Sequence, residues 1–155
     1  MSTSRVELAQ TDIVTAFQAI TTANGYRSNI AEVTTLFQDI SADTLASPIA
    51  SVLMYDETIA PDNAVTWNSM RSEVLCEVVG QVLSTQAEAL AHDFKRVMRA
   101  MSVAHQMGTG SWWLSPKKPT KIFRSPLATA PDGSDVKAWI TAQFWIMLAA
   151  EGPDF

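Results

Sequence analysis

The sequence is poor in cysteine and in long apolar runs, and each scarcity excludes a class of protein. Cys76 is the single cysteine among 155 residues, so a disulfide within the chain is excluded and a reducing compartment is the expected setting. Cys76, His92 and His105 lack the close paired spacing of a tetrahedral zinc site, so we expect no metal and no cofactor. The longest apolar run, 144–150, is far shorter than the about 20 residues of a membrane helix. Because the first residues include no apolar signal region, we expect a soluble, unprocessed chain.

Charge is also scarce. Only 17% of the residues are charged, whereas globular domains carry about 25%. The 11 basic and 16 acidic side chains give a net charge of −5, which argues against a nucleic-acid binder, because such proteins neutralise phosphates. Few charges together with five tryptophans suggest that part of the surface meets protein instead of water. A charge-poor monomer is the alternative.

Two helices are predicted from capping boxes followed by apolar residues at helical spacing. Ser4-Arg5-Val6-Glu7 has the Ser-x-x-Glu form, and the first helix is expected from about Ser4 to Thr22, before a left-handed stop at Asn24-Gly25. Thr85-Gln86-Ala87-Glu88 repeats this form. Apolar residues at spacings of three and four then continue to Met101, which predicts the second helix.

Two long segments in which apolar and polar residues alternate predict strands that have one buried face. The first, Trp67 to Val82, places Cys76 inward as an inert core thiol and its charged residues outward. The second begins at Val136, where every even position to Leu148 is apolar. Shorter extended segments are expected at 30–36 and 49–55.

The remaining segments are expected to be loops. Pro61, Asp62 and Asn63 indicate a mobile loop from Asp56 to Thr66. The stretch 105–130 contains several prolines and glycines and reads as a long excursion, with 121–124 as its one short strand. It carries the pair Trp112-Trp113 and a local basic cluster, for which contact with nucleic acid is an alternative; the cluster is Lys117, Lys118, Lys121 and Arg124.

The order of these elements predicts one α+β domain over residues 1–155. Its mostly antiparallel sheet carries both amphipathic helices on one face, with the long excursion before the last hairpin. The other face of the sheet would carry Trp139 and Trp145 among polar residues, a mixture that protein interfaces favour. Cover by the long loop of the same chain is the alternative for that face.

Motifs of catalysis are missing from the sequence. It has no dinucleotide fingerprint, no phosphate loop, no Gly-x-Ser-x-Gly and no His-Glu-x-x-His. Its paired acids, such as Asp56 with Glu57, fall in an expected loop or on the wet face of a strand, where nothing would separate their pKa values. We therefore do not expect an enzyme, and an unrecognised enzyme type stays an alternative.

The run Ala19-Ile20-Thr21-Thr22-Ala23-Asn24-Gly25-Tyr26-Arg27-Ser28 resembles a signature of the tail terminator and tail completion proteins of long-tailed bacteriophages. The order of elements that follows is similar over most of the chain. A valine-bearing strand is expected at 32–34 and a second strand at 51–57. The long strand, the second helix and a closing strand after a Gly-Ser turn come next.

The resemblance implies a structural role. Subunits would form a closed, hexameric ring on the head-proximal end of the tail tube, stop its polymerisation and offer a surface to the head connector or head-closure protein. The partners are then further copies of the chain, the tail tube protein and the connector, with no membrane and no sequence-specific nucleic acid, although DNA would pass through the ring. The expected location is the virion neck, after assembly in the host cytoplasm.

Two groups of residues are predicted to make these contacts. The ring interface is expected on the wet face of the two long strands, at Arg71, Glu73, Glu77, Trp139, Gln143 and Trp145. Contacts to tube or connector proteins are expected at Asp56, Asp62, Trp112 and Trp113. These residues lie in segments that are expected to become ordered when a partner binds. Alternatives are a different neck or minor tail protein, such as a head-closure protein, and a monomeric ligand-binding domain with tryptophans lining its pocket.

Overall fold

The computed structural model describes residues 4–61, 70–107, 110–125 and 131–151. Its elements confirm the predicted α+β class with a mostly antiparallel sheet. The helices are α1 (Arg5–Gln18) and α2 (Ala87–Ala104), with short 3-10 turns η1 (Thr22–Asn24), η2 (Ala42–Thr44) and η3 (Ser84–Gln86). The strands are β1 (Glu32–Thr34), β2 (Ile49–Pro61), β3 (Met70–Leu83), β4 (Trp112–Leu114), β5 (Lys121–Arg124) and β6 (Lys137–Glu151).

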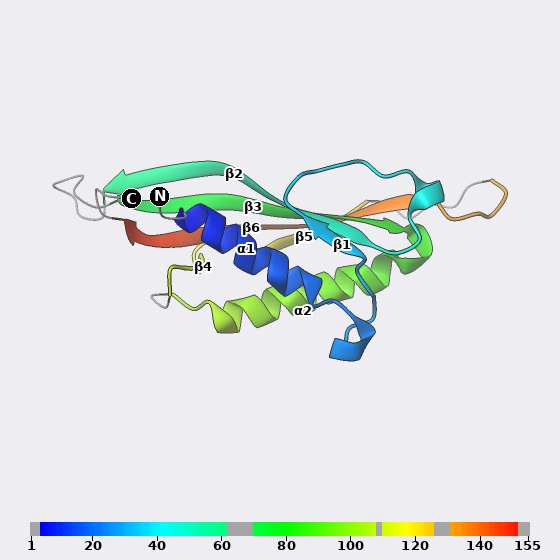
Figure 1. Ribbon diagram of the computed structural model, residues 1–155, viewed down its shortest axis with the longest axis horizontal. Coiled ribbons are helices and arrows are strands. Elements are labelled where there is room, and N and C mark those ends of the chain that lie inside the picture. The colour runs from blue at the N-terminus through cyan, green and yellow to red at the C-terminus, as the bar shows by residue number, and fades with distance from the viewer. Residues whose placement is uncertain (1–3, 62–69, 108–109, 126–130, 152–155) are drawn as a thin grey trace.

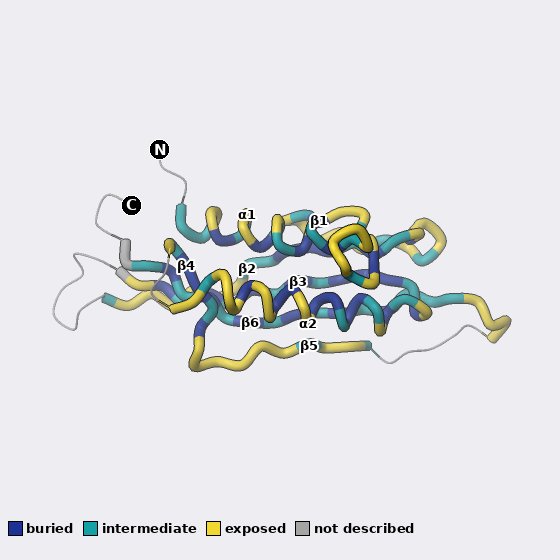
Figure 2. Tube along the Cα trace, turned by 90° about the horizontal axis from the view of Figure 1, so that it is seen from below, coloured by how far each residue is buried: buried dark blue, intermediate teal, exposed yellow. Residues whose placement is uncertain are grey.

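The strands form one sheet in the order β1-β2-β3-β6, and both β4 and β5 pair with the free side of β6. Only β1 and β2 run parallel among the pairs of the described residues. Both helices lie on the same face of this sheet, with α1 on the β2 side and α2 on the β6 side (Figures 1 and 2). We call the side that carries the helices the inner face and the opposite side the outer face.

Alternation along β3 and β6 builds the core, as the sequence predicts. The even positions from Ser72 to Val82 and from Ala138 to Leu148 point to the helices and are buried, and they include Cys76, Phe144 and Ile146. From α1 and α2, Phe17 and Phe94 meet edge to face, with ring centroids 4.9 Å apart, on top of this layer. The dry face of the sheet and the apolar stripes of the two helices therefore form a single cluster.

Gly80 shows how closely α2 approaches β3. A Cβ atom at this position would lie 2.9 Å from Cζ of Phe94 and 3.0 Å from the carbonyl oxygen of Ile140. Glycine is therefore required here by space, since the helix packs directly onto the backbone of the strand.

The first predicted capping box is confirmed, and the second is wrong. Ser4 Oγ accepts from the amide of Glu7, whose carboxylate accepts from the amide of Ser4. α1 ends at Gln18, earlier than the expected Thr22. The left-handed Gly25 caps the short turn η1 and not α1. At α2 the helix begins at Ala87 after η3, and the hydroxyl and amide of Thr85 both donate to Asp135, fifty residues further along the chain.

The expected loop from Asp56 to Thr66 is also wrong over its described part. β2 continues through these polar residues to Pro61, because β3 pairs with it along its whole length. A β-bulge between Met54 and Glu57 leaves Tyr55 and Asp56 opposite Leu75 alone. Residues 62–69, which include the predicted contact Asp62 and the start of the strand expected from Trp67, lie outside the described residues.

Candidate interaction surface on the outer sheet face

The outer face is formed by the odd positions of β3 and β6, with matching positions of β2 and β5. A row crosses its centre from Leu53 through Glu77 and Gln143 to Lys121, which are paired in register. Gln143 Nε2 donates to Glu77 Oε1 at 2.8 Å, so this row is tied together by a side-chain hydrogen bond. No described helix lies over this face, and it is therefore the side on which contacts with other molecules were expected.

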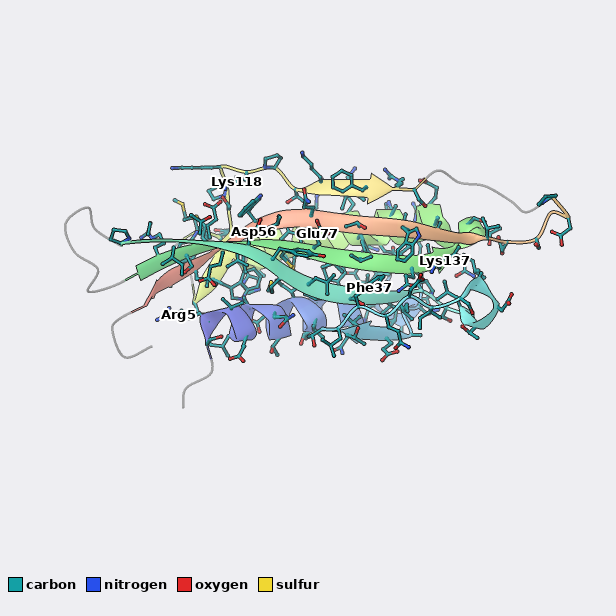
Figure 3. All side chains as sticks on the ribbon, turned by 90° about the horizontal axis from the view of Figure 1, so that it is seen from above. Arg5, Phe37, Asp56, Glu77, Lys118 and Lys137 are labelled. Atoms are coloured by element: carbon teal, nitrogen blue, oxygen red, sulfur yellow. The ribbon has the colours of Figure 1, made fainter. Side chains whose placement is uncertain are left out.

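One end of the outer face is covered by the chain itself. The segment 35–40, between β1 and β2, crosses it and is held by Gln81, whose amide nitrogen donates to the carbonyl of Gln38 at 2.8 Å (Figures 1 and 3). The amide of Ile40 donates back to Gln81 Oε1 at 2.9 Å, and Gln81 is fully buried. Phe37 of this segment stacks on Trp139, with ring centroids 5.8 Å apart.

Lysine side chains cover two of the outer-face aromatics. Lys137 Nζ lies 4.3 Å from the ring centroid of Trp139 and forms an ion pair with Asp39. Lys118 Nζ lies 3.8 Å from the ring centroid of Trp145, which pairs with Leu75. The same ammonium group is 2.8 Å from a carboxylate oxygen of Glu73. Both tryptophans are consequently half-buried by cations of their own chain.

The middle of the face stays open, and the bulge in β2 shapes it. We define the central patch as Tyr55, Asp56, Leu75 and Glu77. Tyr55 is 48% exposed, and Asp56 is exposed, next to the strand that carries Glu77 (Figure 3). Partial burial, and then the nearby carboxylate of Glu77, raise the pKa of the Tyr55 hydroxyl above its usual range.

The six residues predicted for the ring interface lie on the outer face, and the chain itself covers part of that set. Trp139 lies under the 35–40 segment, Glu77 and Gln143 form the central row, and Glu73 and Trp145 share Lys118. Arg71 is exposed beyond them on β3. The expectation that this face is left free is therefore wrong at Trp139 and Trp145, because residues 35–40 and Lys118 lie over these side chains.

The predicted flexible excursion with Trp112 and Trp113 is wrong as well. These residues belong to β4, which pairs with β6, and their side chains are only 1% and 6% exposed. Trp112 reaches the core, where its indole nitrogen donates to Asp12 at 2.8 Å and its ring stacks on His105. The sequence signal that was missed is apolar content, since a strand of two adjacent tryptophans has large apolar area to bury.

The run that carries the resemblance forms a tight turn fixed to α2. Gly25 adopts the left-handed conformation, with φ of 85°, and Arg96 donates to its carbonyl and stacks on Tyr26. The fully buried carboxylate of Asp93 accepts from the amides of Arg27 and Ser28 at 2.8 to 3.1 Å. This run is therefore accounted for by local structure and by contacts with α2.

The single thiol of the chain lies in the core. Burial raises the pKa of the Cys76 thiol, which favours the unreactive protonated form. No cluster of three His, Cys, Asp or Glu side chains that suits a metal ion occurs in the described part of the chain.

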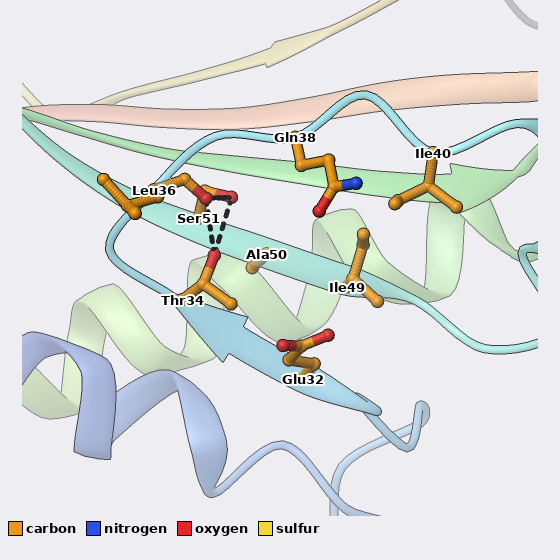
Figure 4. A pocket seen from close by; sticks show the side chains of 8 residues that line it. All are labelled: Glu32, Thr34, Leu36, Gln38, Ile40, Ile49, Ala50 and Ser51. Carbon is orange, nitrogen blue, oxygen red and sulfur yellow. Dashed lines mark hydrogen bonds between the residues drawn. The ribbon is translucent and has the colours of Figure 1, made fainter.

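A small cavity beside β1 is shown in Figure 4. It encloses about 50 Å³, and its hydroxyls, from Thr34 and Ser51, bond to one another and to the carbonyl of Leu36. Ligand sites usually measure about 300–1,000 Å³, so this cavity is too small for such a role.

None of the helices in the described ranges is long and apolar enough to span a membrane. In comparisons with known proteins, no family model and no curated protein matches this sequence.

Proposed function

We propose that this chain is a structural virion protein of a long-tailed bacteriophage. Its copies form a ring, expected to be hexameric, on the head-proximal end of the tail tube. The ring ends tube polymerisation and presents the joining surface for the head connector, and DNA passes through its centre. The protein acts in the virion neck by binding, and no covalent step is assigned to it.

The observation that carries the proposal is the open centre of the outer sheet face. Burying apolar surface against another protein is favourable, and half-exposed tyrosine is typical of such contacts. Tyr55 is 48% exposed there, and the acidic side chain of Asp56 has no partner among the described residues. The phage-like run at Ala19 to Ser28, and an α+β fold of the kind the resemblance implies, give the proposal its particular assembly.

Compared with the interface expected from sequence, the proposed contact keeps Glu77 and is moved from β6 toward the bulge of β2. Trp139 and Trp145 are each covered by a lysine of the same chain, and displacing Lys118 from Trp145 would also expose Glu73 unpaired. The central patch can be covered by another molecule without breaking such contacts.

The test is whether the protein limits tube length. Tail tube protein from the same phage is polymerised with and without this chain, and electron microscopy measures the lengths and the ends. We expect shorter tubes that carry extra density at one end. The variant Tyr55→Asp should cap poorly, whereas Leu8→Asp should cap normally, because Leu8 is an exposed apolar residue on α1, away from the outer face.

Tubes of unchanged length, with no density from this chain at either end, would refute the proposal. A chain that stays monomeric with tubes present, and whose tryptophan fluorescence responds to a small molecule, would favour the ligand-binding alternative.

A further inference from the structure

We propose that copies of this chain join head to tail through two surfaces of opposite charge, the central patch of one copy and a basic stripe on α2 of the next. The basic stripe consists of Lys95, Arg99 and Val103. This inference rests on the proposed ring and names the second surface of its subunit contact.

The basic stripe lies on the side of α2 that faces away from the sheet. Its residues follow at intervals of four, so they share one line along the helix, and all three are exposed. Within the described residues, the charged groups of Lys95 and Arg99 have no partner. Arg96 differs, because it is already bound to Gly25 and Tyr26.

The stripe continues into exposed apolar surface. Val103 is 66% exposed, and Met107, just beyond the end of α2, is 67% exposed. Unpaired cations beside exposed aliphatic side chains on one helix are a suitable match for an acidic patch that contains a tyrosine.

The central patch holds the uncompensated negative charge of the outer face. Glu73 is paired with Lys118, and Asp39 is paired with Lys137. Asp56 has no partner in the described structure, and Glu77 is hydrogen-bonded only to the neutral amide of Gln143. Electrostatic attraction of a cationic partner to the outer face is therefore strongest at this patch.

The two surfaces lie on opposite sides of the subunit. The central patch is on the outer face, and α2 covers the inner face (Figures 2 and 3). A symmetric dimer would bring like surfaces together, acid against acid or base against base. Head-to-tail contact instead sets acid against base, and such contacts close into a ring when the rotation between copies allows it.

A charge-exchange experiment tests the inference. The acid variant carries Asp56→Lys with Glu77→Lys, and the base variant carries Lys95→Glu with Arg99→Glu. Light scattering gives the molar mass of each alone and of an equimolar mixture, with tail tubes present if the unaltered protein assembles only there. We expect rings from the unaltered protein, at least tenfold weaker association of each variant alone, and rings again from the mixture.

The matched control for the base variant is Arg27→Glu with Lys117→Glu, which lowers the net charge by the same amount at exposed sites outside both surfaces and should still form rings. Circular dichroism checks that each variant is folded. If the charge reversals unfold the chain, Asp56→Asn and Arg99→Gln replace them, and each should weaken association.

Rings from each reversed variant alone, or no rings from a mixture of two folded variants, would overturn the inference. The proposed function would survive that result if the unaltered protein still caps tubes. An unaltered protein that neither assembles nor caps tubes would overturn both.

Discussion

The two faces of β3 and β6 are built from alternate residues of the same strands, yet they are buried in different ways. On the inner face, Ile146 and its neighbours are fully covered by α1 and α2. On the outer face, Trp145 and Trp139 are half-covered by single lysines and by one crossing segment. The inner face therefore specifies the fold, whereas the outer face holds contacts that are locally satisfied around an open centre.

A charge introduced at adjacent positions of β6 should have the most different effects on the two faces. Ile146→Asp places a carboxylate in the core. The expected loss is comparable to the whole free energy of unfolding of a domain, about 5–15 kcal/mol. Trp145→Asp loses half-buried ring area and the contact with Lys118, at about 1–3 kcal/mol. Thermal and urea unfolding measure both. Equal loss of folding in the two variants would show that the assignment of inner and outer faces is wrong.

A methyl group added at Gly80 should have the next largest effect. Gly80→Ala brings a Cβ against Phe94, Leu90 and the backbone of Ile140, and overpacking of this kind costs about 1–3 kcal/mol. The adjacent outer-face change Val79→Ala creates no such clash and should cost less. Urea midpoints compare the two variants, and a stability of Gly80→Ala equal to that of the unaltered chain would contradict the close approach of α2.

The smallest expected effect is on the titration of Tyr55. Burial and Glu77 raise the pKa of its hydroxyl, so the folded state holds this proton more tightly than the unfolded state does. Its contribution to stability is therefore lost as the pH rises through the unfolded pKa of about 10 and up to the folded pKa. Absorbance at 295 nm, measured in a Tyr26→Phe background, should show Glu77→Gln moving the Tyr55 pKa downward. An unchanged titration midpoint would show that the carboxylate of Glu77 does not raise the pKa of Tyr55.

The parts of the fold that sequence predicted are those set by neighbouring residues. The alternation from Val136 gave β6, and Ser4 with Glu7 gave the start of α1. The failures all involve distant partners. The amide and hydroxyl of Thr85 donate to Asp135, so they do not form the predicted capping box. The polar end of β2 is a strand because it pairs with β3.

The candidate surface was only half predictable for the same reason. Alternation placed Glu77, Gln143 and Trp145 on the outer face. It carries no information on the cover supplied by residues 35–40, which are held by hydrogen bonds with the side chain of Gln81, or on the cover supplied by Lys118. The bulge that exposes Tyr55 beside Asp56 likewise arises from the pairing of two strands and leaves no mark on periodicity.

We propose that another protein covers the open centre of the outer face in the assembled state. Hydroxyl-radical footprinting of the free chain and of the chain on capped tubes measures this directly at Tyr55, with Leu8 on α1 as the reference side chain. We predict that assembly lowers the oxidation rate of Tyr55 several-fold and leaves that of Leu8 unchanged. Oxidation of Tyr55 at the same rate in both states would contradict the account.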